Sequence, residues 1–552
     1  MKIIIPMSGF GERFRKVGYD VPKPLIEVEN FKFIQHVVNM FSPNEEFIFI
    51  CNENHLNNND WHLRDFLCSL IPKSTVIGIK AHKLGPVHAV LSAREFIKKD
   101  EPIVVNYCDF TCYWEWEKFK LEVLKNNYVA AIPAYKGFHP HSLGTTNYAY
   151  IKEINNFLID IKEKEPFTDN RIEEYASSGT YFFSKGEILV SAFEEVIKRD
   201  LNVNGEYYVS LAYKIIAEKY NNIYVYPLQH FMQWGTPQDL NEYEQWSGTF
   251  KKISKQKKEN QIYEGTLIIP MAGLGKRFKN EGYRKIKPLI EVSGKPMVSQ
   301  AIEDLPIHKN NIFVIRKDIQ FFEDIKKTLI KERPNCVIKS LAYLTEGQAN
   351  TVMEGIKALE KSNINSYMTE PITISACDNG VIYDKQKYKN LLENKNIDVI
   401  VWGFKGFINA KRYPEMYGWI DSDKKGKIKK VSVKKPINNT LTLPIIIGTF
   451  TFKSIKNLKL SLSELISKGE RVNGEFYMDS CINKAIEMGL NCHYFEVDQY
   501  ICWGTPNDLK TFEYWQSCFH KWSYHEYKIQ DDLHIPKEKI HTLEQSFYNF
   551  GK

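Results

Sequence analysis

The chain has 552 residues, of which 43% are hydrophobic and 26% are charged, and its formal net charge at pH 7 is +7. This composition indicates a globular protein of more than one domain, and the mild charge does not favour nucleic acid as a partner. No apolar run approaches the ~20 residues of a membrane span, and the sequence enters an expected strand at once, without a signal peptide. The ten cysteines lack metal-ligand spacing and are typical of reduced thiols. We therefore predict a cytoplasmic protein.

A short stretch at the start of the chain occurs twice. The first copy reads IIIPMSGFGERF from Ile3 to Phe14, and the second reads LIIPMAGLGKRF from Leu267 to Phe278, with eight of twelve positions identical. In each copy the apolar, β-branched run predicts a buried strand. The glycines that follow leave backbone N–H groups free to face a ligand, and an arginine stands among them. The repeat therefore predicts two anion-binding loops.

A Lys-Pro-Leu follows each loop, at Lys23–Leu25 and at Lys287–Leu289, with the same offset of 264 residues as the loops. The loop lacks the third glycine of a dinucleotide fingerprint, and the chain has no Gly-Lys-Ser/Thr of a Walker loop. The pattern resembles the nucleotidyltransferase family that makes NDP-sugars from an NTP and a sugar 1-phosphate. The signature of that family is Gly-x-Gly-x-Arg followed by Pro-Lys-Pro-Leu. The second copy lacks the first proline of this signature, since Ile286 stands there.

The resemblance implies two tandem Rossmann-like, GT-A-like domains of α/β class, each with a mostly parallel central sheet flanked by helices. The residues agree, because expected strands at 47–51 and 312–315 follow expected helices at 35–41 and 297–305, as in βαβ units. We predict domains at 1–246 and 266–514, a solvated basic linker at 247–265, and a C-terminal tail at 515–552 for which the sequence indicates no function. A homo-oligomer is left open.

By the resemblance, Arg13 and Arg277 hold the β- and γ-phosphates, and Lys23 and Lys287 contact the α-phosphate. The loop residues that bind the nucleotide are then Met7, Ser8, Gly9 and Gly11 in the first half and Met271, Ala272, Gly273 and Gly275 in the second.

Glycines Gly85 and Gly347 each open an expected helix. The family has a glycine here that lets the nucleobase lie against bare backbone, which implies base contact for both residues. The alternative is a helix entry that needs glycine for structural reasons alone. His88 is expected on the helix surface.

An aspartate follows a central strand in both halves, at Asp109 and Asp378. Such an aspartate is often only a turn or helix cap. Ligands of parallel sheets, however, sit at the carboxyl ends of the strands, where Mg²⁺ bridging phosphate oxygens needs a hard carboxylate. The family's aspartate at this position binds the metal, which implies that role for both residues.

The middle of each half is expected to bind the acceptor. The family has Glu-Lys-Pro with a phosphate-binding lysine, and a glycine and a glutamate that hold sugar hydroxyls. The resemblance thus implies substrate-binding roles for Lys164, Gly179 and Glu206 in the first half and for Lys434, Gly448 and Glu475 in the second. Asn-Gly-Glu also suits a turn followed by a helix start, which is compatible.

Each half ends in Trp-Gly-Thr-Pro, starting at Trp234 and Trp503. The family has an aspartate two residues before this glycine as its second metal ligand. Here Gln233 and Cys502 occupy that position, and a cysteine is a poor ligand for Mg²⁺. We expect the second half to bind the metal less well than the first.

The function that we predict is transfer of NMP from an NTP to a small phosphorylated acceptor, with release of pyrophosphate, by a bifunctional Mg²⁺-dependent enzyme. Its product would be an activated precursor for surface polysaccharide. Two alternatives stay open. One is that one or both halves are regulatory modules that bind nucleotide or sugar without catalysis. The other is a glycosyltransferase, although neither half contains the Asp-x-Asp motif of that class after its strand.

Overall fold

The computed structural model describes residues 1–257, 261–361, 368–439 and 442–548. The chain forms two compact units. The first contains residues 1–248 together with 514–526 and 544–552, and the second contains residues 249–513 together with 527–543. The two halves predicted from the repeat therefore form the bulk of two units, whereas the C-terminal segment is divided between them.

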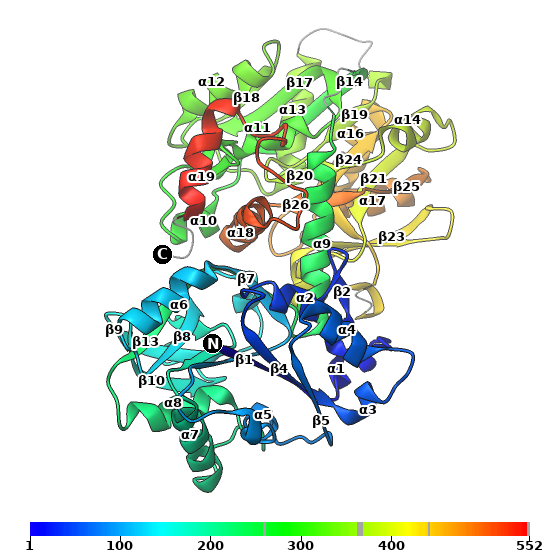
Figure 1. Ribbon diagram of the computed structural model, residues 1–552. Helices are drawn as coiled ribbons and strands as arrows, with labels where there is room; N and C mark the ends of the chain where they lie inside the picture. Colours follow the sequence, from blue (N-terminus) through cyan, green and yellow to red (C-terminus); the bar gives the residue numbers. More distant parts are fainter. Residues whose placement is uncertain (258–260, 362–367, 440–441, 549–552) are drawn as a thin grey trace. The chain divides into compact units, whose positions relative to one another are not determined.

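The first unit is built on an eleven-stranded mixed sheet (Figure 1). At one end of this sheet four neighbouring strands run parallel, and all but the edge strand are apolar and almost fully buried, which is typical of a sheet covered on both faces. In sheet order these are β5 (Thr75–Ile79), β4 (Glu46–Asn52), β1 (Lys2–Met7) and β6 (Ile103–Asn106). The sheet continues with β12 (Thr180–Phe183), β8 (Ala130–Tyr135), β11 (Tyr175–Ser177), β9 (Ala149–Ile154), β10 (Phe157–Glu163), β13 (Ile223–Gln233) and β7 (Phe110–Tyr113).

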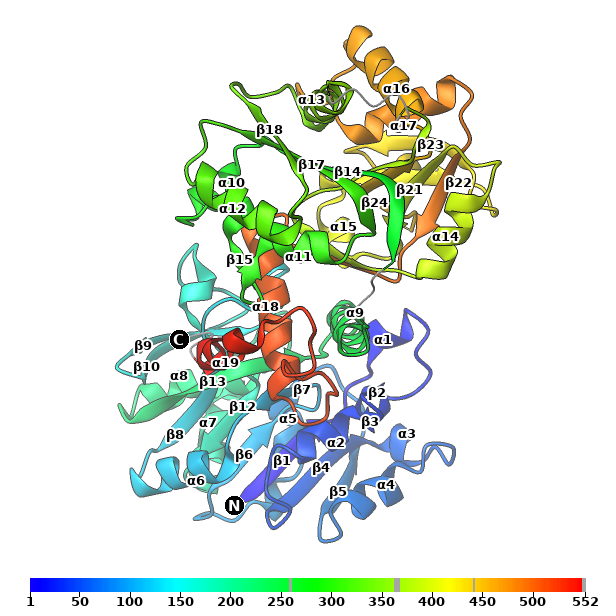
Figure 2. The same cartoon turned by 90° about the horizontal axis from the view of Figure 1, so that it is seen from above.

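The second unit repeats the order of the first six strands of this sheet, as the sequence repeat predicts (Figure 2). Strand β14 pairs in parallel with β17 and β19, just as β1 pairs with β4 and β6. The strands in order are β18 (Val337–Leu341), β17 (Ile307–Arg316), β14 (Ile262–Met271), β19 (Ile372–Ile374), β24 (Ile445–Phe452), β21 (Val399–Phe404) and β25 (Cys492–Glu496). Two further strands of this sheet, β22 (Gly418–Ser422) and β23 (Ile428–Val433), lie off this path. A separate pair is formed by β20 (Asn379–Ile382) and β26 (Gln499–Cys502). The predicted α/β class is confirmed.

Helices connect the strands in both units. Those that begin in the first unit are α1 (Glu12–Arg15), α2 (Phe33–Val38), α3 (Glu53–Leu56), α4 (Leu63–Leu70), α5 (Pro86–Leu91), α6 (Trp116–Lys125), α7 (Gly186–Lys198), α8 (Val209–Ala217) and α9 (Pro237–Ser254). Those that begin in the second are α10 (Lys276–Asn280), α11 (Met297–Glu303), α12 (Phe322–Glu332), α13 (Gln348–Glu360), α14 (Lys385–Glu393), α15 (Ile408–Arg412), α16 (Ile455–Ser467), α17 (Met478–Glu487), α18 (Pro506–Lys521) and α19 (Ile540–Tyr548). No described helix is both long enough and apolar enough to cross a membrane.

The expected solvated linker at 247–265 is largely regular structure instead. Helix α9 continues to Ser254, and β14 begins at Ile262. The reason is that Phe250 and Ile253 lie three residues apart on one helix face and are both buried, so that the lysines between and after them occupy the other faces. The lysine content alone predicted a loop, whereas the two buried apolar side chains stabilise a helix here.

The C-terminal segment contributes aromatic side chains to the core of the first unit. Trp522 lies against His36, Tyr243 and Trp234, with ring centroids 5.2, 6.0 and 6.2 Å apart. The Tyr514 hydroxyl donates a hydrogen bond to the backbone carbonyl of Phe231. Residues 514–526 are therefore a structural part of this unit rather than an appended tail.

The next part of the segment belongs to the second unit. The His534 ring lies between two carboxylates, with Nε2 2.8 Å from Asp304 and Nδ1 3.0 Å from Asp532. Burial disfavours the imidazolium, but the two carboxylates outweigh it and raise the pKa of His534 well above its usual value. The other oxygen of Asp304 accepts a hydrogen bond from the backbone N–H of Val381 in β20. The segment thus supports the strand that follows Asp378.

We expect Trp522→Ala to destabilise the first unit by about 3–5 kcal/mol, the range for removing a large buried aromatic side chain. Hydrogen exchange followed by mass spectrometry measures this locally, because each unit yields its own peptides. Peptides from β1 and β4 should exchange faster, while those from β14 and β17 should not. Leu533→Ala, which truncates an exposed side chain of the same segment, is the matched control. Unchanged exchange in β1 and β4 would contradict a structural role for residues 514–526.

Candidate active site

The repeated glycine loop follows the central strand of each sheet. Gly11 and Gly275 both have left-handed backbones, with φ of 65° and 59°, and each caps the short helix that carries the arginine. A side chain on Gly11 would meet no protein atom within 4 Å. The glycine is therefore required by the backbone conformation, and the space in front of it is open to a ligand.

A lysine, an aspartate and a backbone carbonyl meet beside this loop. The Nζ of Lys23 lies 2.5 Å from Oδ2 of Asp109 and donates a second hydrogen bond, of 3.0 Å, to the carbonyl of Gly235. Three sequence motifs, Lys-Pro-Leu, the strand-end aspartate and Trp-Gly-Thr-Pro, are thereby brought to one point. The aspartate lies at the carboxyl end of β6, where the parallel topology predicts a ligand site.

The second unit repeats this arrangement. Lys287 forms an ion pair with Asp378 and donates a hydrogen bond of 3.0 Å to the carbonyl of Gly504. Burial opposes the charge on Lys287, but the Asp378 carboxylate more than compensates, so that the pKa of the lysine is raised. The aromatic residue beneath each lysine is also repeated, since Phe14 and Phe278 lie 5.6 and 5.8 Å from the respective Nζ. Both halves therefore carry the same fixed cation.

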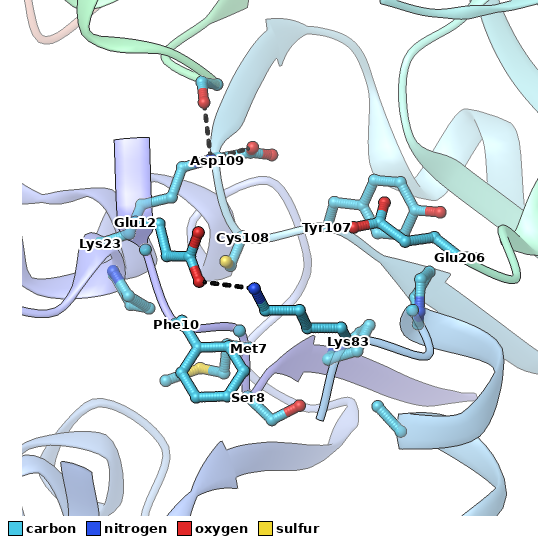
Figure 3. Close-up of a pocket in the computed structure, with 18 of the residues that line it drawn as sticks. Met7, Ser8, Phe10, Glu12, Lys23, Lys83, Tyr107, Cys108, Asp109 and Glu206 are labelled. Carbon is cyan, nitrogen blue, oxygen red and sulfur yellow. Dashed lines mark hydrogen bonds and ion pairs between the residues drawn. The ribbon is translucent and has the colours of Figure 1, made fainter. Parts of the chain in front are cut away.

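A cavity of about 540 Å³ lies in front of the first loop (Figure 3). This volume lies within the usual range for a small-molecule site. Of the residues predicted from the sequence, the cavity brings together Met7, Ser8, Gly9, Gly11, Arg13, Lys23, Gly85, Asp109 and Glu206. Lys164 and Gly179 are not in its lining, although each contacts a tyrosine that is.

The charged, imidazole and phenol side chains of five further residues, which the sequence did not single out, also line the cavity. They are Glu12, His82, Lys83, Tyr107 and Tyr208. Figure 3 shows Lys83 extending toward Glu12, and their charged atoms are 3.0 Å apart. Tyr208 had a sequence signal, because Tyr477 follows Glu475 by the same two residues as Tyr208 follows Glu206. Lys83 and His82 had none, since the second half places Thr345 and Leu344 there.

Gly85 and Gly347 have a structural reason to be glycine. A side chain on Gly85 would lie 2.7 Å from the backbone nitrogen of Tyr207, and one on Gly347 would lie 2.6 Å from the carbonyl oxygen of Phe476. Both glycines also have positive φ. Of the two alternatives, close backbone packing is thus sufficient for the glycines, and base contact by Gly85 stays a prediction that its place in the cavity lining permits.

The expected acceptor residues of the first half form a connected group. Lys164 donates a hydrogen bond of 2.5 Å to the Tyr208 hydroxyl, which in turn donates to the carboxylate of Glu206. Gly179 has a φ of 96° and packs against the Tyr107 ring, which a side chain would approach to 3.0 Å. Lys164 and Gly179 therefore contact two tyrosines of the cavity lining, Tyr208 and Tyr107.

The second half has the same glycine geometry but different lysine contacts. Lys434 donates to the carbonyl of Met416 at 2.5 Å, and Gly448 has a φ of 79°. Burial lowers the pKa of Lys434, with nearby Asp479 opposing this effect. Glu475 lies among the charges that act on Lys434. The expected acceptor regions of the two halves are thus related in backbone but not in side-chain contacts.

The donor set near Asp109 fits a hard cation such as Mg²⁺. A side chain placed on Gly235 would lie 3.4 Å from Oε1 of Gln233 and 3.5 Å from Oδ2 of Asp109, so these two oxygens flank one point. Asp239 approaches the same point but is held by Thr236, whose hydroxyl donates to it at 2.6 Å in a helix cap. Oxygen ligands of this kind suit Mg²⁺. Among the described residues, no group of three or more His, Cys, Asp and Glu side chains has metal-binding geometry.

The second half replaces one of these oxygens by sulfur. Burial, with help from Asp508, raises the pKa of Cys502 well above its usual value, so that the thiol stays protonated. It donates to Asp508 at 3.6 Å. A neutral thiol is a poor ligand for a hard cation, which leaves Asp378 as the oxygen donor at this point.

Comparison with known proteins assigns the first half to a family. Residues 2–245 match the family model described as nucleotidyl transferase. The chain contains a nucleotidyltransferase domain. The bifunctional protein GlmU of Fervidobacterium nodosum is 23% identical over 219 residues, and the match spans 38% of this chain and 42% of that protein, less than half its length.

Two further proteins are similar to part of this chain. The CTP:phosphoglutamine cytidylyltransferase of Campylobacter jejuni is 24% identical over 241 residues, with 40% of this chain and 90% of that protein covered. A solved nucleoside-diphosphate-sugar pyrophosphorylase from Vibrio cholerae is 20% identical with a TM-score of 0.37, covering 45% of this chain and 98% of that one.

We expect Gly11→Val to weaken nucleoside triphosphate binding by the first half, because a β-branched side chain would occupy the open space in front of the loop. Isothermal titration with ATP, CTP, GTP and UTP measures the affinity. Gly18→Val is a matched control, since Gly18 also has positive φ and open space but does not line the cavity. Equal affinities of the two variants for every nucleotide would exclude the loop as a phosphate site.

Proposed function

We propose that each half transfers a nucleoside monophosphate from an NTP to a small phosphorylated acceptor and releases pyrophosphate. The observation that carries this proposal is the lysine–aspartate–carbonyl arrangement beside the glycine loop, which occurs in both units. The family match of residues 2–245 supports it for the first half. For the second half the support is the repeat of the same residues on the same strands.

In the proposed reaction, an oxygen of the acceptor phosphate attacks the α-phosphorus of the NTP. The bond between the α-phosphorus and the oxygen that bridges to the β-phosphate breaks, and pyrophosphate leaves with that electron pair. No protein nucleophile takes part, so the residues contribute alignment and charge. Arg13 and Arg277 would hold the β- and γ-phosphates, and Lys23 and Lys287 would contact the α-phosphate. Bound Mg²⁺ would neutralise triphosphate charge, held by Asp109 or Asp378.

The ion pair gives the lysine a defined position before substrate binds. Lys23 and Asp109 are both partly shielded from solvent, with side chains 19% and 26% exposed. A lysine fixed in this way loses little freedom when negative charge builds on the α-phosphate, which is the condition for electrostatic catalysis. The acceptor is a phosphomonoester, and a relative named for phosphoglutamine supports acceptors other than sugar phosphates. Synthesis of a surface-polysaccharide precursor in the cytoplasm is the role that we propose for the product.

One observation favours a regulatory role for the second half. Cys502 stands where a metal-binding oxygen is expected, and its thiol is protonated. If the half binds nucleotide without turnover, it would act as a binding module for the first. Pyrophosphate release separates the two possibilities, since only a catalytic half produces it.

The proposal is tested by a matrix of the four NTPs against glucose 1-phosphate, glycerol 3-phosphate and phosphoethanolamine, with pyrophosphate release as the readout. Asp109→Asn should abolish the first activity alone and Asp378→Asn the second alone, because each site has its own aspartate. The second activity should need more Mg²⁺ for half-maximal rate, since it has one fewer oxygen donor. Asp60→Asn, on an exposed loop, is the control. Loss of all activity with either single mutation would show one composite site.

Lys23→Ala and Lys287→Ala should each lower the kcat of their own half by about 10²–10³, the loss typical of one positioned electrostatic contact. Steady-state kinetics in the background of the opposite Asp→Asn mutation separates the two activities. Lys118→Ala removes a lysine that is 73% exposed on α6 and should have no effect. Normal turnover by the double Lys→Ala protein would refute the assigned role.

A further inference from the structure

The lysines at the acceptor side mark equivalent positions in the two halves. Lys164 and Lys434 both have left-handed backbones, with φ of 59° and 61°. Their backbone N–H groups donate to the carbonyls of Tyr148 and Tyr417, at 2.8 and 3.0 Å. The residues that precede them, Glu163 and Val433, therefore correspond as well.

In the first half a carboxylate stands beside the lysine. Glu163 is partly exposed, and its Oε2 accepts a hydrogen bond of 2.6 Å from the hydroxyl of Ser210 on α8. Burial raises the pKa of Glu163 to about 7, while Ser210 and Lys164 oppose the rise. The carboxylate is carried by strand β10, and the neutral partner is carried by the helix.

In the second half the two positions are exchanged. Val433 replaces Glu163, and Asp479 on α17 stands at the position of Ser210, with the offset of 269 residues that also relates Glu206 to Glu475 and Tyr208 to Tyr477. Like Glu163, Asp479 is partly exposed, and the lysine is its charged neighbour. Each half therefore has a carboxylate at one of these two positions near the lysine, but on opposite elements.

A third position, Gly418, differs between the two halves in a way that accommodates the Asp479 carboxylate. A side chain on Gly418 in β22 would lie 2.1 Å from Oδ2 of Asp479, so that Asp479 excludes any residue but glycine there. The first half has Ala149 at the position of Gly418 and a serine in place of the aspartate. Three substitutions thus fit one another, which indicates that the position of the carboxylate is a property of each half.

The surroundings of Asp479 leave its carboxylate available to a ligand. No side-chain hydrogen bond from the described residues reaches it, and burial raises its pKa to about 6 against the attraction of Lys434. The other charged groups around this lysine are Arg277, Glu475 and Glu415, and Tyr477 lies within reach of the Asp479 charge. An ionised carboxylate accepts hydrogen bonds but donates none. Its partner must therefore be a donor.

We propose that Asp479 is an acceptor-binding residue of the second half, where it accepts hydrogen bonds from hydroxyl or amino groups of the phosphorylated acceptor. Because the first half presents its carboxylate from the opposite element, the two halves bind different acceptors. The inference rests on the proposed function, since it identifies a contact of the same site.

The test measures the second activity in the Asp109→Asn background with glucose 1-phosphate, glycerol 3-phosphate and phosphoethanolamine. Asp479→Ser installs the residue that the first half has naturally. It should raise the KM for the acceptor about 10- to 100-fold, the effect of losing a hydrogen bond to a charged group, and leave kcat within a few-fold. A purely structural role of Asp479 would instead lower both kcat and the thermal stability of the variant. Circular dichroism melting of the same variant detects the loss of stability.

Two further variants keep the result interpretable. Val433→Glu combined with Asp479→Ser moves the carboxylate to its first-half position, and it should shift the order of acceptor preference toward that of the first half. In the wild-type second half, the acceptor KM should fall between pH 5 and 7 as Asp479 ionises. Asp479→Asn preserves the side-chain volume but cannot ionise, so it should reduce this fall. The acceptor phosphate also titrates near pH ~6, but it does so in both proteins, so the difference between them reports Asp479.

The outcomes separate the inference from the proposed function. An active second half whose acceptor KM and preference are unchanged by Asp479→Ser would overturn the inference alone. If the second half releases no pyrophosphate, isothermal titration with the same three phosphomonoesters decides. Binding that weakens in Asp479→Ser would support the acceptor contact while refuting catalysis, and absence of binding to the wild-type chain would overturn both.

Discussion

The ion pair between the motif lysine and the strand-end aspartate is the constraint on which both sites depend. Lys23 is separated from Asp109 by 86 residues and from Gly235 by 212, and it binds both. A partly buried lysine without an anionic partner would be costly, so each member of the set holds the others in place. The sheet order, the glycine loop and the helix after Trp-Gly-Thr-Pro all serve to bring these three groups together.

This much could be predicted from the sequence, because it depends on local signals and one topological rule. The apolar run before Gly9 marks a central strand, and Asp109 follows another. Parallel strands present their carboxyl ends at one edge of the sheet, which places both residues at the same site. The repeat that begins at Leu267 contains the same motifs a second time. The α/β class and the second sheet could therefore be predicted as well.

Other features depend on contacts between distant segments, which no local pattern contains. Gly85 is glycine because the backbone of Tyr207, over a hundred residues later, packs against it. Lys83 and His82 enter the cavity through a loop that the second half does not reproduce. The exchange between Glu163 and Asp479 was equally hidden, since no local signal marks Asp479 as the counterpart of Glu163. Only the backbone correspondence of the two lysines reveals it.

The division of the C-terminal segment has a consequence for synthesis of the chain. The first unit needs residues 514–526, so its core cannot be complete when residue 248 leaves the ribosome. At the usual ~5–20 residues per second, the roughly 280 residues in between take about 15 to 55 s to translate. During that interval Trp522 has not been synthesised, and the apolar surface around Trp234 that it contacts in the folded unit stays uncovered. Chaperone demand in the cell should therefore be highest for the half that is translated first.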